Sequence, residues 1–103
     1  MTQRSALVLR VKPDRVDEYV RAHREVWPEM LAALRDAGIR NYTIFRAGNQ
    51  MFGYFEADDL EAAGRSMAEQ EVSTRWQDAM AELLVERVPE AGPHPLEEVF
   101  RLE

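Results

Sequence analysis

The chain of 103 residues contains no cysteine, which excludes disulfides, thiolate catalysis and cysteine-based metal sites. Its two histidines, His23 and His94, lie far apart in the sequence and are a poor start for a zinc site. No apolar run approaches the ~20 residues of a membrane span. There is no glycine-rich phosphate loop, nucleophile elbow or HExxH motif. We therefore expect neither metal nor cofactor, and the chemistry that remains is acid–base chemistry around one histidine.

Basic residues are also scarce, because 13 Lys and Arg stand against 19 Asp and Glu, for a net charge of −6. Nucleic acid and anionic membrane both require clustered basic residues, so neither is expected as a partner. The N-terminal residues show no signal-peptide cleavage region, which favours a cytoplasmic protein. At 46% hydrophobic residues, the sequence predicts one domain over residues 1–103 that oligomerisation would help to stabilise.

The first half of the chain predicts a strand followed by an interrupted helix. Residues 5–11 are short, rich in Leu and Val and apolar on both faces, which indicates a central strand. Helical spacing then runs from Val16 to Leu34. Pro28 falls inside this pattern and lacks the N–H that the helix requires, so we expect a kink or break near Trp27.

The second half predicts a hairpin, two helices and a last strand. Ser73 and Thr74 are expected to cap the second of these helices. The predicted elements are two strands within 41–58 around the turn signal AGNQ, helices over 59–69 and 73–88, a proline-rich loop over 88–95 and a closing strand over 96–102.

The resulting order, β-α-β-β-α-(α)-β, predicts a ferredoxin-like α+β fold with an antiparallel sheet and helices on one face. The predicted strands nevertheless carry large apolar residues on both faces, such as Leu9 against Val8 and Tyr42 against Phe45. Because the helices can cover only one face, we predict a homodimer packed sheet to sheet.

A row of aromatic and imidazole side chains is the sharpest candidate for a site. Tyr19, His23 and Trp27 follow at steps of four, which on a helix places them on one face. Such rings would cover the C–H surface of a small polyol while their polar tips bind its hydroxyls. Histidine also titrates near neutrality. The alternative is that His23 is structural, with its nitrogens bonded to backbone or water, and that the other rings, including Trp76, are core.

Four stretches of the sequence then point to a known family. They are EYVRAHREVWPE at 18–29, the segment from Gly38 to the Asn-Tyr pair at 41–42, Arg-Trp at 75–76 and LEEVF at 96–100. In these stretches the chain resembles the L-rhamnose mutarotases over nearly its whole length. The resemblance implies a small dimeric ferredoxin-like protein, a dimeric α+β barrel, that interconverts the α and β anomers of L-rhamnose without a cofactor.

The resemblance also implies roles for individual residues. The family's general acid matches His23, and its substrate contacts match Tyr19, Tyr42 and Trp76. His23 would donate a proton to the ring oxygen of the sugar and take it back on closure, while a water or a tyrosine assists. Where rhamnose-specific members often have a second tryptophan, this chain has Gln77, a further candidate for substrate binding. L-Fucose or another 6-deoxy sugar is therefore an alternative substrate.

Two alternatives of other classes stay open. The chain could be a non-catalytic, ligand-binding member of the dimeric α+β barrel proteins, with His23 merely packed. It could also be a cofactor-independent or haem-using oxygenase on the same fold.

Overall fold

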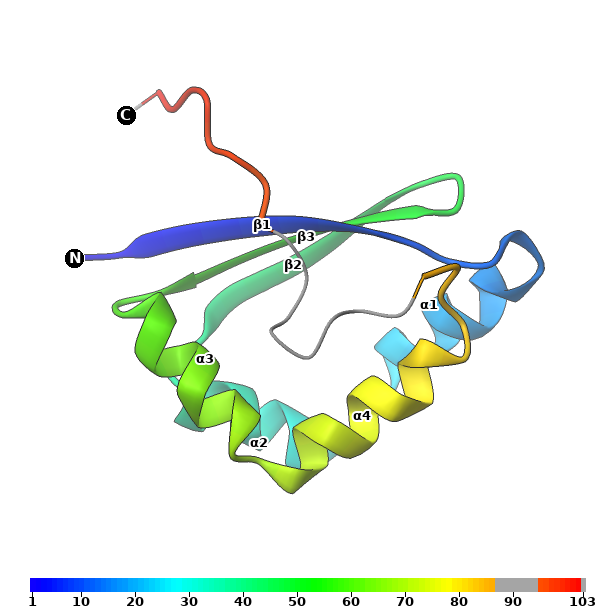
Figure 1. The fold of residues 1–103 in the computed structure, drawn as a ribbon, viewed down its shortest axis with the longest axis horizontal. Coiled ribbons are helices and arrows are strands. Elements are labelled where there is room, and N and C mark those ends of the chain that lie inside the picture. The colour runs from blue at the N-terminus through cyan, green and yellow to red at the C-terminus, as the bar shows by residue number, and fades with distance from the viewer. Residues whose placement is uncertain (87–94, 103) are drawn as a thin grey trace.

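A computed structural model describes residues 1–86 and 95–102, and these form a three-stranded sheet with the helices on one side of it (Figure 1). The longest helix in this part of the chain has 11 residues, and none is long and apolar enough to cross a membrane. The elements are β1 (Gln3–Arg10), a 3-10 turn (Pro13–Arg15), α1 (Val16–Arg24), α2 (Pro28–Asp36), β2 (Arg40–Ala47), β3 (Gln50–Ala57), α3 (Leu60–Ala68) and α4 (Glu71–Ala81).

The sheet has the strand order β1-β3-β2, and both pairs are antiparallel. The predicted hairpin is confirmed, since β2 and β3 are joined at Gly48 and Asn49. Gly48 has a φ of 61°, a left-handed conformation that glycine adopts without steric cost. The antiparallel sheet with helices on one side confirms the predicted ferredoxin-like α+β class.

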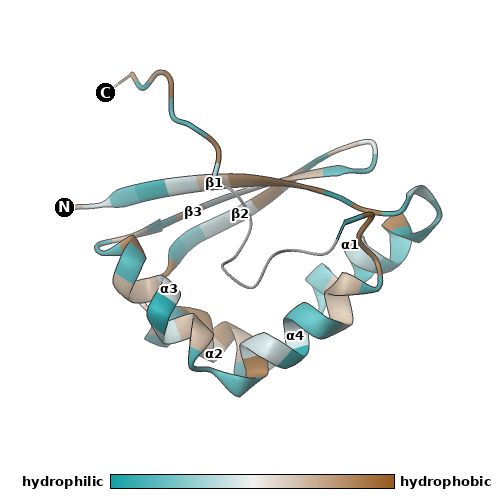
Figure 2. Ribbon diagram, viewed as in Figure 1, coloured by the Kyte–Doolittle hydropathy of each residue, from teal (hydrophilic) through white to brown (hydrophobic). Residues whose placement is uncertain are grey.

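The strand register decides which side chains face the helices, because residues paired across strands share a face. Leu7 pairs with Gly53, which places both on the buried, helix-facing side. Phe45 pairs with Phe52 on the opposite side, where both are exposed. The sheet therefore presents apolar residues on its outer face as well, as the sequence predicts, and Figure 2 shows that hydrophobic residues continue along the strands.

The helix break at Pro28 is also confirmed. α1 ends at Arg24 and α2 begins at Pro28. Trp27, the residue before the proline, has an extended backbone with φ −54° and ψ 133°. A proline disfavours the helical conformation of the residue that precedes it, because its ring collides with that residue's backbone. Trp27 therefore leaves the helical row that begins at Tyr19.

The predicted caps of the last helix are wrong. α4 begins at Glu71, and the backbone N–H groups of Ser73 and Thr74 already bond to the carbonyl of Gln70. Ser73 is buried inside the first turn of the helix. Both residue types are good caps, but packing of α4 against α2 decides where the helix starts. A side-chain cap does occur on α3, where Asp59 accepts a hydrogen bond from the N–H of Ala62 at 3.0 Å.

The closing strand predicted over 96–102 is not present in the single chain. Leu96 donates its N–H to the carbonyl of Ala6 at 2.6 Å, and Pro95 forms a bridge with Leu7. Beyond this point the C-terminal arm, residues 96–102, leaves β1 and extends over the side of the sheet opposite the helices (Figure 1). Within one chain, backbone pairing with β1 therefore begins at Pro95 and Leu96 but does not continue along the arm. Most of the predicted loop 88–95, including His94, lies outside the described residues.

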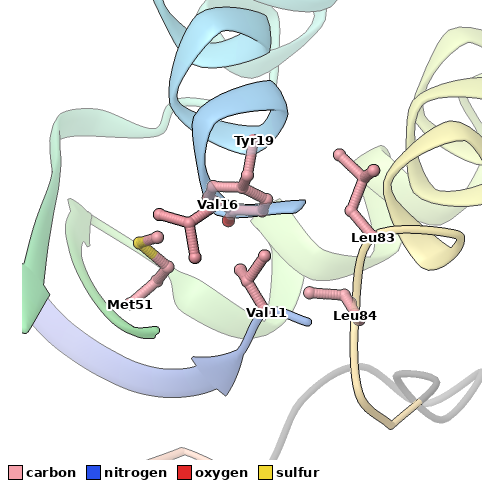
Figure 3. Packing of buried hydrophobic residues seen from close by; sticks show 6 residues of the cluster. All are labelled: Val11, Val16, Tyr19, Met51, Leu83 and Leu84. Carbon is pink, nitrogen blue, oxygen red and sulfur yellow. The ribbon is translucent and has the colours of Figure 1, made fainter. Parts of the chain in front are cut away.

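Two buried clusters hold the helices to the sheet and to one another. The first joins α1, β3 and the chain after α4, and Figure 3 shows its side chains pointing toward one another. The second lies between α2 and α4. The first comprises Val11, Val16, Tyr19, Met51, Leu83 and Leu84, and the second Met30, Ala33, Val72 and Trp76.

Shortening a side chain of the first cluster should destabilise the fold. Met51 is 2% exposed, so Met51→Ala leaves a cavity and should lower the free energy of unfolding by about 2–5 kcal/mol. Leu31→Ala on the exposed side of α2 is the control, with an expected loss below ~1 kcal/mol. Urea unfolding followed by circular dichroism measures both. Equal losses in the two variants would contradict this assignment of the core.

Candidate active site

His23 lies in the last turn of α1, one turn beyond Tyr19. Its Nδ1 is 2.8 Å from the backbone carbonyl oxygen of Tyr19. A carbonyl oxygen can only accept, so Nδ1 carries the proton and donates it. In the neutral imidazole the other nitrogen, Nε2, then holds a free lone pair. Within residues 1–86 and 95–102, Nε2 has no hydrogen-bond partner.

The surroundings of His23 favour its neutral form. Partial burial lowers the pKa of the imidazole, and the hydrogen bond to the Tyr19 carbonyl opposes this only in part. Burial acts in this direction because it disfavours the charged form. At neutral pH the ring therefore presents an unprotonated Nε2 that can accept a proton and return it.

A chain of ring contacts surrounds this imidazole. Tyr19 stacks on His23 with ring centroids 4.2 Å apart. Trp76, from α4, meets His23 edge to face at 5.3 Å, and Trp27 meets Trp76 at 5.0 Å. The predicted row of three rings on one helix is therefore wrong in its last member. Because α1 ends before Trp27, the ring next to the imidazole comes from α4 instead.

Tyr19 belongs to the buried core and also contacts His23. It is 4% exposed and packs in the first buried cluster, next to Val16 (Figure 3). Burial raises the pKa of its phenol to about 12, and the nearby phenol of Tyr42 adds to this rise. The hydroxyl of Tyr19 therefore stays protonated at neutral pH.

Tyr42 is the predicted site residue that lies on the sheet. It lies on β2 and stacks on Phe55 of β3 at 5.2 Å. Burial raises the pKa of its phenol although the residue as a whole is 42% exposed. The Tyr42 phenol also raises the pKa of Tyr19, so the two phenols lie within electrostatic range of each other.

The structure brings four of the five predicted site residues together and leaves one apart. Gln77 is exposed on α4 and points about 100° around the helix from Trp76. Phe55, whose ring stacks on Tyr42, is not among the residues predicted for the site. The Gly/Asn turn at 48–49 fixes the hairpin register, and counting back from that turn would have placed these two rings close together.

Two open clefts of about 320 Å³ each lie at the surface. One is formed by the 3-10 turn and the β2–β3 hairpin and contains none of the predicted site residues. The other is bordered by Trp27 and Trp76 together with charged residues of α1. Neither cleft includes His23. In the described ranges, no three His, Asp or Glu side chains gather in a way that could hold a metal ion.

Fold and site together define a class: a ferredoxin-like α+β protein with a single, partly buried imidazole set among aromatic rings. Comparisons with known proteins narrow it. The family described as L-rhamnose mutarotase matches residues 4–102. An L-rhamnose mutarotase of Pectobacterium carotovorum is 36% identical and aligns with 97% of this chain and 98% of its own.

Solved structures agree. The crystal structure of an L-rhamnose mutarotase from Formosa agariphila has a TM-score of 0.79 and 29% identity, covering 98% of this chain and 99% of its own. A protein described as dimeric and ferredoxin-like, from an uncultured marine organism, has a TM-score of 0.65 at 15% identity, which shows the fold alone. The chain belongs to the L-rhamnose mutarotase family, whose members are carbohydrate isomerases that interconvert anomers.

The protonation of His23 gives a first test of the site. In a His94→Gln variant only one imidazole remains, and its nitrogens can be followed by NMR against pH. We expect the Nδ1–H tautomer and a pKa below the ordinary value near 6.5. The Nε2–H tautomer, or a pKa above the ordinary value, would contradict the site geometry.

The same shift predicts how stability depends on pH. Between the native pKa of His23 and ~6.5, the unfolded chain binds more protons than the folded chain. The contribution of His23 is therefore fully present above ~6.5 and is lost as the pH falls through this window. Urea unfolding from pH 7.5 to pH 5 should show this loss in the His94→Gln variant. It should be absent when His23 is also replaced by Gln.

Proposed function

We propose that this chain interconverts the α and β anomers of L-rhamnose by acid–base-assisted opening and closing of the sugar ring, with His23 as the group that moves the proton. The observation that carries the proposal is the imidazole whose Nδ1 is bonded to the Tyr19 carbonyl while Nε2 has no partner in the described chain. Family membership supports the reaction and the substrate.

The reaction needs one proton to move between two oxygens on the same carbon. Neutral Nε2 accepts the proton of the anomeric hydroxyl, and the imidazolium so formed donates it to the ring oxygen. The C1–O5 bond breaks and the C1=O1 aldehyde forms. After rotation about C1–C2, the O5 hydroxyl attacks the other face of the aldehyde, and Nε2 carries its proton back to O1. A single histidine suffices because atoms and charges balance over the cycle, and such assistance contributes typically ~10²–10⁴-fold.

The aromatic residues around His23 would hold the sugar for this transfer. Trp76 contacts the imidazole from α4, and Tyr42 on the sheet lies within electrostatic range of Tyr19. Aromatic faces of this kind cover the C–H surface of a sugar. The Tyr19 hydroxyl, protonated at working pH, can donate to a sugar oxygen. An amide at Gln77 gives hydrogen bonds where an indole would give a flat apolar surface. Gln77 lies apart from the other four site residues, so L-fucose or another 6-deoxy sugar stays the second candidate substrate on the sequence difference alone.

Replacing His23 tests the proposed proton transfer directly. His23→Gln should lower the enzymatic rate of anomer exchange roughly 10²–10⁴-fold, because no group with a matched pKa remains. Saturation-transfer proton NMR on equilibrated L-rhamnose, then on L-fucose, measures the exchange between the two anomeric protons. The faster of the two sugars identifies the preferred substrate.

Two outcomes would refute this assignment. His94→Gln is the matched control and should exchange the sugar as the wild type does. If a folded His23→Gln variant keeps the wild-type rate, His23 is not the acid–base group. If the folded wild type transfers saturation with neither sugar, the chain is a binding protein or acts on another substrate.

The outer face of the sheet supports a homodimer as the working form. Phe45 is 65% exposed there and pairs with the exposed Phe52. The C-terminal arm, anchored by an ion pair between Arg4 and Glu98 at 2.7 Å, extends over the same side of the sheet (Figure 1). Its apolar residues are exposed in one chain, Phe100 by 79%. A second copy would cover both the face and the arm, and the cytoplasm is the compartment that we propose.

A charge on the outer face should separate the copies. Phe45→Glu would place a carboxylate opposite apolar surface, which is costly to bury, so we expect a monomer at micromolar concentration. Sedimentation velocity measures the mass, with Leu31→Glu on exposed α2 as the control that should stay dimeric. A wild type that sediments as a monomer at this concentration, or a Phe45→Glu variant that stays dimeric, would refute the sheet-to-sheet dimer.

A further inference from the structure

We infer that Trp27 is a positioning residue of the sugar site: its ring packs edge to face against the Trp76 indole and so fixes the orientation in which Trp76 contacts His23. This inference rests on the proposed function, because it assigns Trp76 to the sugar site. In the described residues Trp27 has a ring contact with Trp76 and none with His23, and it borders the same open cleft as Trp76.

Ring geometry is the first support. Trp27 and Trp76 meet at 5.0 Å with their planes at 89°, and Trp76 meets His23 at 5.3 Å with planes at 80°. Edge-to-face contacts with centroids 4.5–7 Å apart are the favoured arrangement of aromatic pairs. Trp76 therefore has two favourable ring contacts, one with His23 and one with Trp27.

The position of Trp27 is itself fixed by its chain neighbours. Pro28 holds Trp27 in an extended conformation, and the Trp27 carbonyl accepts the N–H of Met30 at 2.9 Å to begin α2. The ring therefore projects from the rigid start of a helix. A residue in the middle of an uninterrupted α1 would point elsewhere, so the break at Pro28 places this ring against α4.

Arg75 of α4 also contacts the Trp27 ring. The guanidinium of Arg75 lies 5.9 Å from the centre of the Trp27 ring, within the range of a cation–π contact. The same guanidinium donates to Glu29 at 3.0 Å. Arg75 directly precedes Trp76, and Glu29 follows Pro28, so these contacts join the two segments that carry the tryptophans. Both partners are largely exposed, so the ion pair is a minor contribution beside the ring contact.

Kinetics separate positioning from a purely structural role. Trp27→Leu keeps an apolar side chain but loses the aromatic ring, and should raise the KM for L-rhamnose roughly three- to tenfold, the range that an aromatic pair supplies. The kcat should change less than about twofold, because lost uniform binding raises KM alone. Trp27→Phe keeps a ring and should restore most of the KM. A general loss of folding would instead lower kcat through a smaller active fraction.

Circular dichroism reports the ring contact without any assay of activity. The chain has two tryptophans, and two indoles at 5.0 Å couple to give a paired positive and negative band. We expect this band pair in the wild type and its loss in both Trp27→Phe and Trp76→Phe. Arg75→Gln should keep the bands and shift KM by less than about twofold, as expected of an exposed pair. Arg65→Gln, which breaks a comparable exposed pair on α3, should leave both unchanged.

The outcomes distinguish this inference from the proposed function. A wild type without anomer exchange would overturn both. If the wild type is active and a folded Trp27→Leu variant has the same KM, only the positioning role of Trp27 is overturned. A Trp27→Phe variant no better than Trp27→Leu, or a wild type without the coupled bands, would also overturn this role. A raised KM that Trp27→Phe rescues, together with the loss of the bands, would establish it.

Discussion

The hydrogen bond from His23 Nδ1 to the Tyr19 carbonyl is the interaction on which the account of the site depends. It joins two residues one helical turn apart, so its geometry comes from α1 itself. By holding the proton on Nδ1, it leaves the lone pair on Nε2, the nitrogen that we propose meets the substrate. It also opposes the effect of burial on the imidazole, and so keeps the pKa from falling as far as burial alone would take it.

The fold serves this bond by holding α1 in place. The Tyr19 ring is anchored in the buried cluster with Met51 of β3, and its backbone carbonyl is thereby fixed for the imidazole (Figure 3). α4 supplies Trp76 from the other side, held against α2 by the second cluster. The reactive group thus lies between two packed layers, while its own side chain stays only partly buried. That combination lowers the pKa of the imidazole and leaves part of its side chain open to solvent.

Much of this could be predicted from local pattern. Strand alternation assigned both faces of the sheet, the Gly/Asn turn located the hairpin, and Pro28 located the helix break. These features depend on neighbours in the sequence. Contacts between distant segments could not be predicted in the same way. The insertion of Trp76 between His23 and Trp27 requires knowing how α4 crosses α1, which helical spacing does not contain.

The errors have the same origin. Ser73 and Thr74 are suitable caps, yet α4 starts earlier because its packing extends to Val72. The C-terminal arm has the composition of a strand, but a single chain pairs it with β1 only at its first residues. In the proposed homodimer, a second copy of the chain would supply the strand partner that this arm lacks. The family resemblance, by contrast, was carried by local stretches such as EYVRAHREVWPE, and the comparisons confirm it.

The central claim is that His23 begins the reaction as a neutral base. The most direct test measures the pH dependence of anomer exchange and the NMR titration of the His23 nitrogens in one sample of the His94→Gln variant. The account predicts that, after subtraction of the uncatalysed rate, exchange rises with pH through the pKa of His23 and then levels off. A rate that falls as His23 loses its proton, or one that ignores this titration, would contradict it.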